Sequence, residues 1–204
     1  MITTRNIEEN DDLLRNTLID FLYKVPMLSG DEVEKLADEI KVDFFKKGTI
    51  LVEEGKVCNK CFFVLKGCLR QYLLVNGNDK TTKFYTEEEA AVFFTSLSSS
   101  TKSSSYLTCV EDSILIVGEP SADDETFKKF PKLEQITRMM VEQDFGKIQD
   151  ELSWFIASSP EERYLNLIKF RPTLLQRVPQ HQLASYIGVT PESLSRIRKR
   201  VLRN

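Results

Sequence analysis

The sequence has no long hydrophobic run and almost no histidine. None of its apolar stretches approaches the roughly 18 to 20 residues that span a bilayer, and its start, MITTRNIEENDD, is polar and acidic, unlike a signal peptide. We therefore expect a cytoplasmic protein without a membrane partner. A single histidine, His181, leaves little general-base chemistry, and no paired carboxylates, nucleophile–base set or phosphate-binding loop emerges. The sequence therefore predicts no enzyme.

Cysteine is scarce as well. Four cysteines in 204 residues, without a secretory signal, favour reduced thiols over a disulfide framework. The hydrophobic share of 41%, with 10% aromatic residues, is enough to build real cores. A chain of this length therefore holds one large globular domain or two unequal ones.

The net charge of −3 hides a strong asymmetry along the chain. Residues 163–204 contain nine Lys or Arg and one acid, Glu192, and so carry a net charge of +8. The preceding 162 residues carry 19 basic and 30 acidic side chains, a net charge of −11. The C-terminal end is therefore suited to a polyanionic partner, and the rest of the chain is not.

Hydrophobic periodicity is helical at the start of the chain, then typical of strands, and then helical again. Residues 1–40 have helical spacing, with Ser29 as a helix N-cap. From Val42 to about Val117, short apolar runs alternate with glycines, and NGND at 76–79 is a hairpin signal. This pattern predicts an antiparallel β-roll with flanking helices, in a sensor domain of residues 1–130. The fold class is therefore α+β.

A long helix is predicted over residues 131–157. Five apolar residues follow alternating steps of four and three, as in a coiled-coil seam: Val141, Phe145, Ile148, Leu152 and Phe155. Leu133, Ile136 and Met140 lie on a different face. We expect this second face to pack on the roll and the seam to pack on a second copy of the chain. A purely internal amphipathic helix is the alternative.

Residues 180–200, QHQLASYIGVTPESLSRIRKR, have the pattern of a helix-turn-helix motif within a C-terminal domain of residues 158–204. The motif needs a small residue inside its first helix and a glycine at the turn, and Ala184 and Gly188 occupy these positions. Thr190 is expected to cap the second helix. The apolar residues expected to hold the two helices together are Leu183, Ile187, Val189, Leu194 and Ile197.

The second helix of the motif has opposed apolar and polar faces, and the polar face is suited to the major groove of DNA. Arg196 can donate twice to guanine, and Glu192 can accept from a cytosine amino group. The cations better suited to phosphate are Arg198, Lys199 and Arg200, and the helix wheel places Arg203 on the same polar face. We interpret the lone histidine as a phosphate or cap contact. The predicted DNA-binding residues are Gln180, His181, Thr190, Glu192, Ser193, Ser195, Arg196, Lys199 and Arg200.

This order of roll, long helix and terminal helix-turn-helix resembles the CRP/FNR superfamily of bacterial transcription regulators. Residues 45–74, FKKGTILVEEGKVCNKCFFVLKGCLRQYLL, resemble its glycine before the second strand, its EG turn and its K-G turn. Residues 190–199, TPESLSRIRK, resemble its recognition helix, with Glu192 and Arg196 at the main base-reading positions. The resemblance implies a homodimer joined through the long helix that reads a palindromic site in double-stranded DNA. RNA polymerase is a further candidate partner.

The sequence departs from the family at the effector cassette. The family has a Gly-Glu pair followed by an arginine that holds the cyclic phosphate. Between Gly77 and Glu119 this chain has neither, and Lys102 is the only cation of the serine-rich part. Because a buried phosphate would lack a bidentate partner, we expect a degenerate pocket that does not bind cyclic AMP. The effector stays unknown, and residues 96–105 are interpreted as a polar loop.

Two further departures concern DNA recognition. Pro191 stands where the family often has arginine, so the family's operator sequence is not expected. The β-hairpin wing that usually follows the recognition helix is also missing, and its phosphate contacts with it. A sensor that acts through protein contacts, with a vestigial DNA motif, is therefore the alternative function.

The cysteines leave a redox version of that alternative open. Cys58, Cys61, Cys68 and Cys109 resemble the supply of thiolates in the family's iron–sulfur branch. That branch, however, carries its clustered cysteines before the roll, and strand alternation here sends the thiols to different faces. We interpret them as small buried hydrophobes, and expect neither a cofactor nor a metal.

Overall fold

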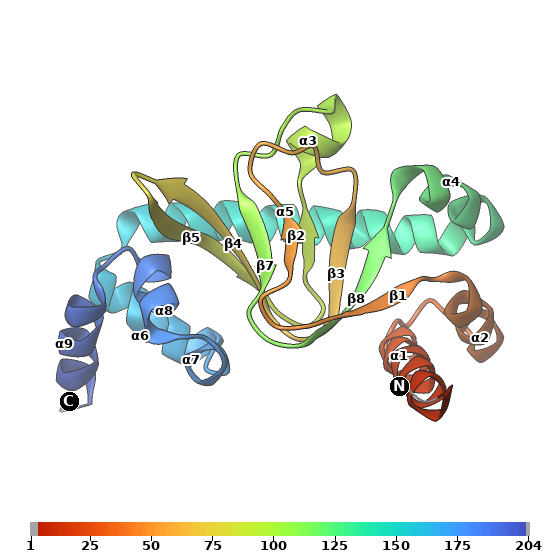
Figure 1. Ribbon diagram of the computed structural model, residues 1–204, viewed down its shortest axis with the longest axis horizontal. Coiled ribbons are helices and arrows are strands. Elements are labelled where there is room, and N and C mark those ends of the chain that lie inside the picture. Colours follow the sequence, from red (N-terminus) through yellow and green to blue (C-terminus); the bar gives the residue numbers. More distant parts are fainter. Residues whose placement is uncertain (1–3, 203–204) are drawn as a thin grey trace.

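The structure of the chain is a computed structural model that describes residues 4–202, and it consists of an antiparallel β-sandwich flanked by helices (Figure 1). In the described residues, the sandwich follows two N-terminal helices and precedes six C-terminal ones. The elements are α1 (Thr4–Leu22), α2 (Gly30–Glu39), β1 (Val42–Phe45), β2 (Ile50–Val52), β3 (Cys61–Lys66), β4 (Leu69–Val75), β5 (Asn78–Tyr85), β6 (Ala90–Val92), α3 (Phe94–Ser99), β7 (Tyr106–Cys109), β8 (Ser113–Gly118), α4 (Pro120–Lys129), α5 (Pro131–Ala157), α6 (Pro160–Phe170), α7 (Leu174–Arg177), α8 (Gln180–Ile187) and α9 (Pro191–Val201).

The N-terminal helices form as predicted. The Ser29 hydroxyl accepts from the Glu32 backbone N–H at 3.4 Å, and the Glu32 carboxylate accepts from the Ser29 N–H at 2.8 Å, which completes a capping box. The same carboxylate pairs with Lys132 at the start of α5 at 2.8 Å. The apolar faces of α1 and α2 pack together on one edge of the sandwich, against Ile114 of β8.

The predicted roll is a sandwich of two four-stranded sheets, with strand orders β1-β8-β3-β6 and β2-β7-β4-β5. Residues 76 and 77 form the β4–β5 turn predicted from NGND, because Asn76 (φ 52°) and Gly77 (φ 76°) both adopt positive φ between paired Val75 and Asn78. Gly67 is required by packing as well as by its φ of 115°, since an added Cβ would lie 2.3 Å from the Ser113 hydroxyl oxygen. The turns of the sandwich were thus readable from the sequence.

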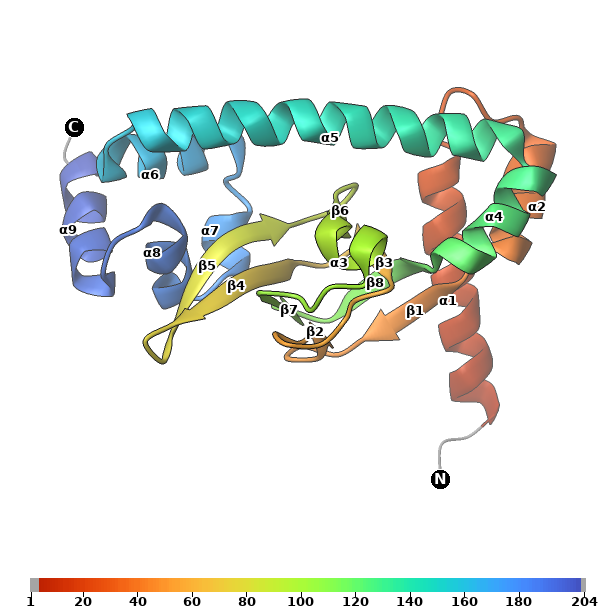
Figure 2. The same ribbon diagram turned by 90° about the horizontal axis from the view of Figure 1, so that it is seen from above.

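The long predicted helix is α5, with 27 residues. Figure 2 shows it running along the whole molecule, from α2 and α4 at one end to α6 at the other. Of the face predicted to pack on the roll, Ile136 is buried and Met140 is only half-buried. Leu133 packs against a cluster formed mainly by the N-terminal helices, to which the sandwich contributes Leu65 and Ile114. Gly146 lies inside the helix without interrupting it. No helix in residues 4–202 is long and apolar enough to cross a membrane.

The C-terminal helices share a hydrophobic core with the sandwich. Leu167 of α6, Leu174 of α7 and Leu183 of α8 are buried in the same cluster as Cys68 and Phe84 of the sheet. The rings of Phe84 and Tyr186 meet edge to face, with 5.2 Å between their centroids. The C-terminal unit therefore rests directly on the sheet that contains β4 and β5.

Candidate nucleic-acid interface

The helix-turn-helix motif predicted over residues 180–200 is formed by α8 and α9. Gly188 ends α8 in the left-handed region, with φ 81°, and the Val189 N–H donates to the Ala184 carbonyl at 2.9 Å. A Cβ at position 188 would lie 3.1 Å from Arg163 Nη1, which donates to the Ile187 carbonyl. Glycine is therefore needed here for both backbone conformation and space.

The second helix is capped and packed as its sequence predicts. The Thr190 hydroxyl accepts from the Ser193 N–H at 3.3 Å, and Pro191 occupies the first helical position. Leu194 and Ile197 are buried against α8, which confirms the apolar face of the predicted helix wheel. Of the other predicted contacts between the helices, Leu183 and Ile187 are buried, and Val189 packs beside them.

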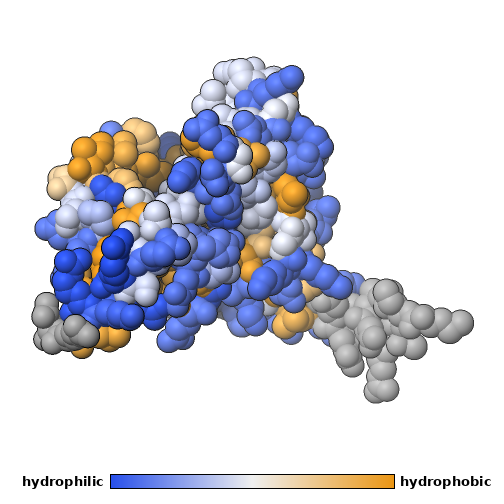
Figure 3. All heavy atoms as spheres, turned by 60° about the vertical axis from the view of Figure 1, so that its left-hand side comes forward, coloured by the Kyte–Doolittle hydropathy of each residue, from blue (hydrophilic) through white to orange (hydrophobic). Residues whose placement is uncertain are grey.

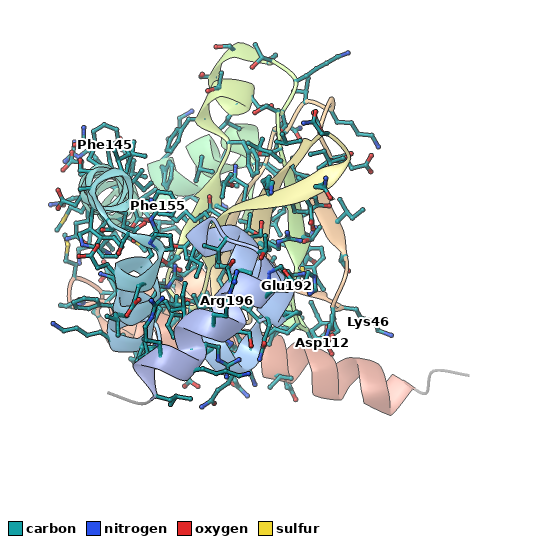
Figure 4. The ribbon with its side chains drawn as sticks, turned by 90° about the vertical axis from the view of Figure 1, so that its left-hand side faces the viewer. Lys46, Asp112, Phe145, Phe155, Glu192 and Arg196 are labelled. Carbon is teal, nitrogen blue, oxygen red and sulfur yellow. The ribbon has the colours of Figure 1, made fainter. Side chains whose placement is uncertain are left out.

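The opposite face of α9 is polar and exposed. Glu192, Ser195, Arg196 and Lys199 are all exposed, and Figure 4 shows Glu192 and Arg196 on α9. The Arg196 guanidinium donates to the Ser193 hydroxyl at 3.0 Å, so one turn of the helix supports its side chain. The pKa of Glu192 is lowered by its own backbone N–H and by the Thr190 hydroxyl, which keeps the carboxylate ionised as an acceptor.

Two predicted residues have partners that the sequence did not indicate. Ser193 is half-buried, and its hydroxyl is held between Thr190 and Arg196. Arg200 pairs with Glu161 of α6 at 2.8 Å. Arg203, which the helix wheel places on the polar face, lies outside the described residues.

The first turn of α8 offers backbone donors. Pro179 precedes the helix and supplies no side-chain cap, so the first N–H groups of α8 are left to other partners. Gln180 and His181 lie at this end and are exposed. A helix N-terminus of this kind suits a phosphate oxygen, as the sequence predicts.

The predicted seam of α5 lies mostly on the surface. Phe145 is 63% exposed and Leu152 59% exposed. Figure 3 shows hydrophobic surface gathered on the side of the molecule where α5 lies, apart from the hydrophilic surface over α9. Phe155 differs, because the Arg163 guanidinium lies 3.7 Å from its ring centroid and the side chain faces the protein (Figure 4). The structure adds further exposed apolar residues that the seam pattern missed: Met139, Trp154 and Ile156.

The interior of the sandwich is closed by its own side chains. The Tyr85 hydroxyl donates to the Gln71 amide oxygen at 2.8 Å, and the Gln71 amide nitrogen donates to the Ser105 hydroxyl at 2.9 Å. Ser96 is also buried, and its hydroxyl donates to the Thr101 carbonyl at 2.6 Å. The serine-rich stretch is thus bonded to itself and to the neighbouring strands.

Sequence reasoning missed Arg70 of β4, which is only 4% exposed. Its guanidinium donates to the Thr81 hydroxyl at 2.8 Å and to Asp79 at 2.6 Å, and it lies over the Tyr72 ring. Strand alternation alone would have left this face of the sheet in solvent. The C-terminal helices that cover it bury the charge.

Three of the four cysteines are buried, and Cys61 is half-buried. Burial raises the pKa of Cys68 to about 12 and that of Cys109 to about 11, which disfavours the thiolate that metals and oxidants require. Among the side chains that the structure describes, those of residues 11–119 and 125–202, no three His, Cys, Asp or Glu are grouped so that they could hold a metal ion.

Comparisons with known proteins agree with this architecture. Residues 42–122 match the family model of the cyclic nucleotide-binding domain. No curated protein matches the sequence significantly.

Solved structures match over most of the chain. The c-di-GMP responsive global regulator CLP from Xanthomonas campestris is 14% identical, with a TM-score of 0.65 over 86% of this chain and 92% of that one. FixK2 from Bradyrhizobium japonicum is 14% identical, with a TM-score of 0.62 over 80% and 85% of the two chains. The catabolite activator protein of Thermus thermophilus is 17% identical, with a TM-score of 0.51 over 87% and 85%. The chain therefore has a CRP/FNR-like fold.

Proposed function

We propose that the protein is a homodimeric transcription regulator that reads a palindromic DNA site with α9. The observation that carries this proposal is that α9 has an apolar face that is buried and an opposite polar face that is exposed. Its apolar face, with Leu194 and Ile197, is buried against α8, while Glu192, Arg196 and Lys199 are exposed together. A helix presented in this way fits the major groove, with Arg196 and Glu192 near the end that reaches base edges.

The exposed seam of α5 supports the homodimer. Phe145, Ile148 and Leu152 lie on one side of a helix that runs the length of the molecule, so a second copy could bury all three. Association through this helix would place the two copies of α9 on either side of a twofold axis. Two such helices match a palindromic site whose half-sites are about one helical turn apart.

Cyclic AMP is not the proposed effector. Residues 78–119 contain no arginine, and the hydroxyls of Ser96 and Tyr85 are bonded within the protein. A buried phosphate would therefore find no bidentate donor in this stretch. Calorimetric titration with cyclic AMP should show no binding at millimolar ligand.

Selection of bound sequences from random duplexes tests the function. We expect enrichment of one palindromic motif, and binding that weakens steeply with salt because Lys and Arg displace counterions from phosphate. Arg138, which is exposed on α5, serves as the control: Arg138→Ala should leave the selected motif unchanged. If the wild-type protein enriched no palindrome, the motif would be vestigial and a sensor acting through protein contacts would be favoured.

A further inference from the structure

The junction between the sandwich and the helix-turn-helix unit contains a second set of charged contacts. Residues 86–89, Thr-Glu-Glu-Glu, connect β5 to β6, and we call this segment the acidic turn. Arg177, the last residue of α7, donates to both oxygens of Glu87 at 2.8 Å, and its guanidinium also pairs with Glu111. This bidentate contact lies three residues before α8 begins.

A second arginine binds the other end of the acidic turn. Arg171, which follows α6, donates to the Phe84 carbonyl and the Thr86 hydroxyl at 3.1 Å each. It also pairs with the Glu89 carboxylate at 2.6 Å. Arg171 lies three residues before α7, and Arg177 is its last residue. Both ends of this short helix are therefore bound to the same turn of the sandwich.

The carboxylates are held in place by the sandwich itself. One oxygen of Glu87 accepts from the Gly67 N–H at 3.0 Å, and Glu89 accepts from the Thr86 N–H at 2.6 Å. The acceptors are therefore oriented independently of the arginines. Pre-oriented acceptors reduce the side-chain entropy that is lost when an ion pair forms.

A third contact fastens α8 to the sheet. The Ser185 hydroxyl accepts from the Thr81 N–H of β5 at 2.9 Å and donates to the Asp79 carbonyl at 3.3 Å. Arg70 braces this part of β5 from β4, through the Thr81 hydroxyl and Asp79. Two buried polar atoms, Arg70 Nη2 on the sheet and Gln182 Oε1 on α8, have no hydrogen-bond partner among the described residues.

These ion pairs differ from ordinary surface pairs. The side chains of Arg171 and Arg177 are only 19% and 21% exposed, whereas that of Arg15, which pairs with Glu34 and Asp38 beside the N-terminal helices, is 41% exposed. Partial burial weakens screening by salt, and the bidentate geometry restricts orientation as well as distance. The contacts are therefore suited to fixing how the helix-turn-helix sits on the sandwich.

We propose that the acidic turn is a clamp that holds the helix-turn-helix in its DNA-reading orientation. Arg171, Arg177, Glu87 and Glu89 are then positioning residues, which act on DNA through α8 and α9 and do not touch it. The role of this clamp in DNA reading rests on the proposed function. Its physical content, an orientation fixed by ion pairs, is tested without DNA.

Hydrogen exchange on the full chain, without added ligand, tests the clamp itself. In Arg177→Gln and Glu87→Gln we expect backbone exchange in residues 78–86 and 180–187 to rise by about 2- to 150-fold, the range that corresponds to the coupling energies between residues in one network. Arg15→Gln removes an arginine that also pairs with two carboxylates but lies outside the junction, and should leave both segments unchanged. If Arg177→Gln does not fold, Arg177→Lys, which keeps the charge and loses the fork, replaces it. Unchanged exchange in both junction variants would overturn the clamp.

Half-site spacing separates positioning from general stability. Against palindromes with half-sites moved apart or together by one to three base pairs, we expect the wild type to prefer one spacing, and the junction variants to bind several almost equally. A loss of affinity that is uniform across spacings would mean a purely structural role and would also overturn the clamp. Failure of the wild type to bind any palindrome would refute the proposed function, while the exchange result would still decide the clamp.

Discussion

At the scale of single residues, Arg196 carries the sharpest prediction about DNA reading. Its guanidinium is exposed on α9 and steadied by the Ser193 hydroxyl at 3.0 Å. Arg196→Ala should cost about 1 to 3 kcal/mol of discrimination and relax the preference at one base position per half-site. Competition binding with single-base variants of the selected palindrome measures this.

Lys199 is the matched control on the same face. Lys199→Ala should weaken binding to all sequences alike and lower the slope of log affinity against log salt by about one. If Arg196→Ala also weakened all sequences uniformly, Arg196 would be a phosphate contact and its base-reading role would be wrong.

Gly188 gives a prediction about stability. Because its φ is 81° and an added Cβ would meet Arg163 Nη1 at 3.1 Å, Gly188→Ala should destabilise the protein by about 1 to 3 kcal/mol. Gly146 is a matched control, since it lies in α5 with nothing within 4 Å of an added Cβ. Gly146→Ala should be neutral or stabilise by up to about 1 kcal/mol. Chemical denaturation of both variants gives the comparison, and equal effects would contradict it.

At the scale of elements, α5 should determine the oligomeric state. Phe145→Glu places a charge at the centre of the exposed seam, and charged groups are costly to bury in an apolar interface. We expect this variant to sediment as a monomer at concentrations where the wild type is a dimer. Gln143→Glu adds the same charge at an exposed polar position of the helix and should leave the dimer intact. A dimer that survived Phe145→Glu would have to be joined elsewhere.

At the scale of the whole molecule, the junction should respond to pH. Burial alone would raise the pKa of Glu87, but the Arg177 guanidinium and the Gly67 N–H outweigh it, and the pKa is lowered below its ordinary value of 4.5. A carboxyl whose pKa is lowered in the folded state stabilises that state above its unfolded pKa and loses this contribution as pH falls through the folded pKa. An open cleft of about 640 Å³, lined by Glu87, Glu111 and Arg177, gives solvent access to the pair.

The expected outcome concerns the difference in unfolding free energy between the wild type and Glu87→Gln. This difference should be constant near neutral pH and shrink as pH falls below about 4.5. The reason is that the wild-type carboxyl then becomes protonated and therefore uncharged, as the amide that replaces it is at every pH tested. Denaturant titrations from pH 7 to pH 3 measure this difference. A difference that grew on acidification would mean that Glu87 is not stabilised as a carboxylate.

Much of the candidate site could be predicted because its signals are local. Thr190 caps α9 as the sequence predicts, and the α8–α9 turn follows from Gly188. The apolar face of α9 could likewise be read from spacing alone, since Leu194 and Ile197 are one turn apart. Each of these features depends on residues within a few positions of one another, where backbone geometry leaves few choices.

The junction could not be predicted for the opposite reason. Arg171 and Arg177 meet carboxylates that lie between 66 and 90 residues away in the sequence. The glutamates of the acidic turn follow no sequence pattern that would identify their partners. Arg70 belongs to the same class, because only the docking of α8 on β5 decides that its side of the sheet is buried.

By itself, the sequence determined where the chain changes from helices to strands and back, where the β4–β5 and α8–α9 turns lie, and which side of α9 is charged. It did not indicate the short helix α3, which occupies part of the predicted polar loop at 96–105. Tertiary structure alone decided how α8 and α9 are attached to the sandwich, and which charged side chains form that attachment. The physical reason is range: caps, turns and helix faces arise from interactions within about one turn of chain, whereas ion pairs between distant segments exist only after packing has brought them together.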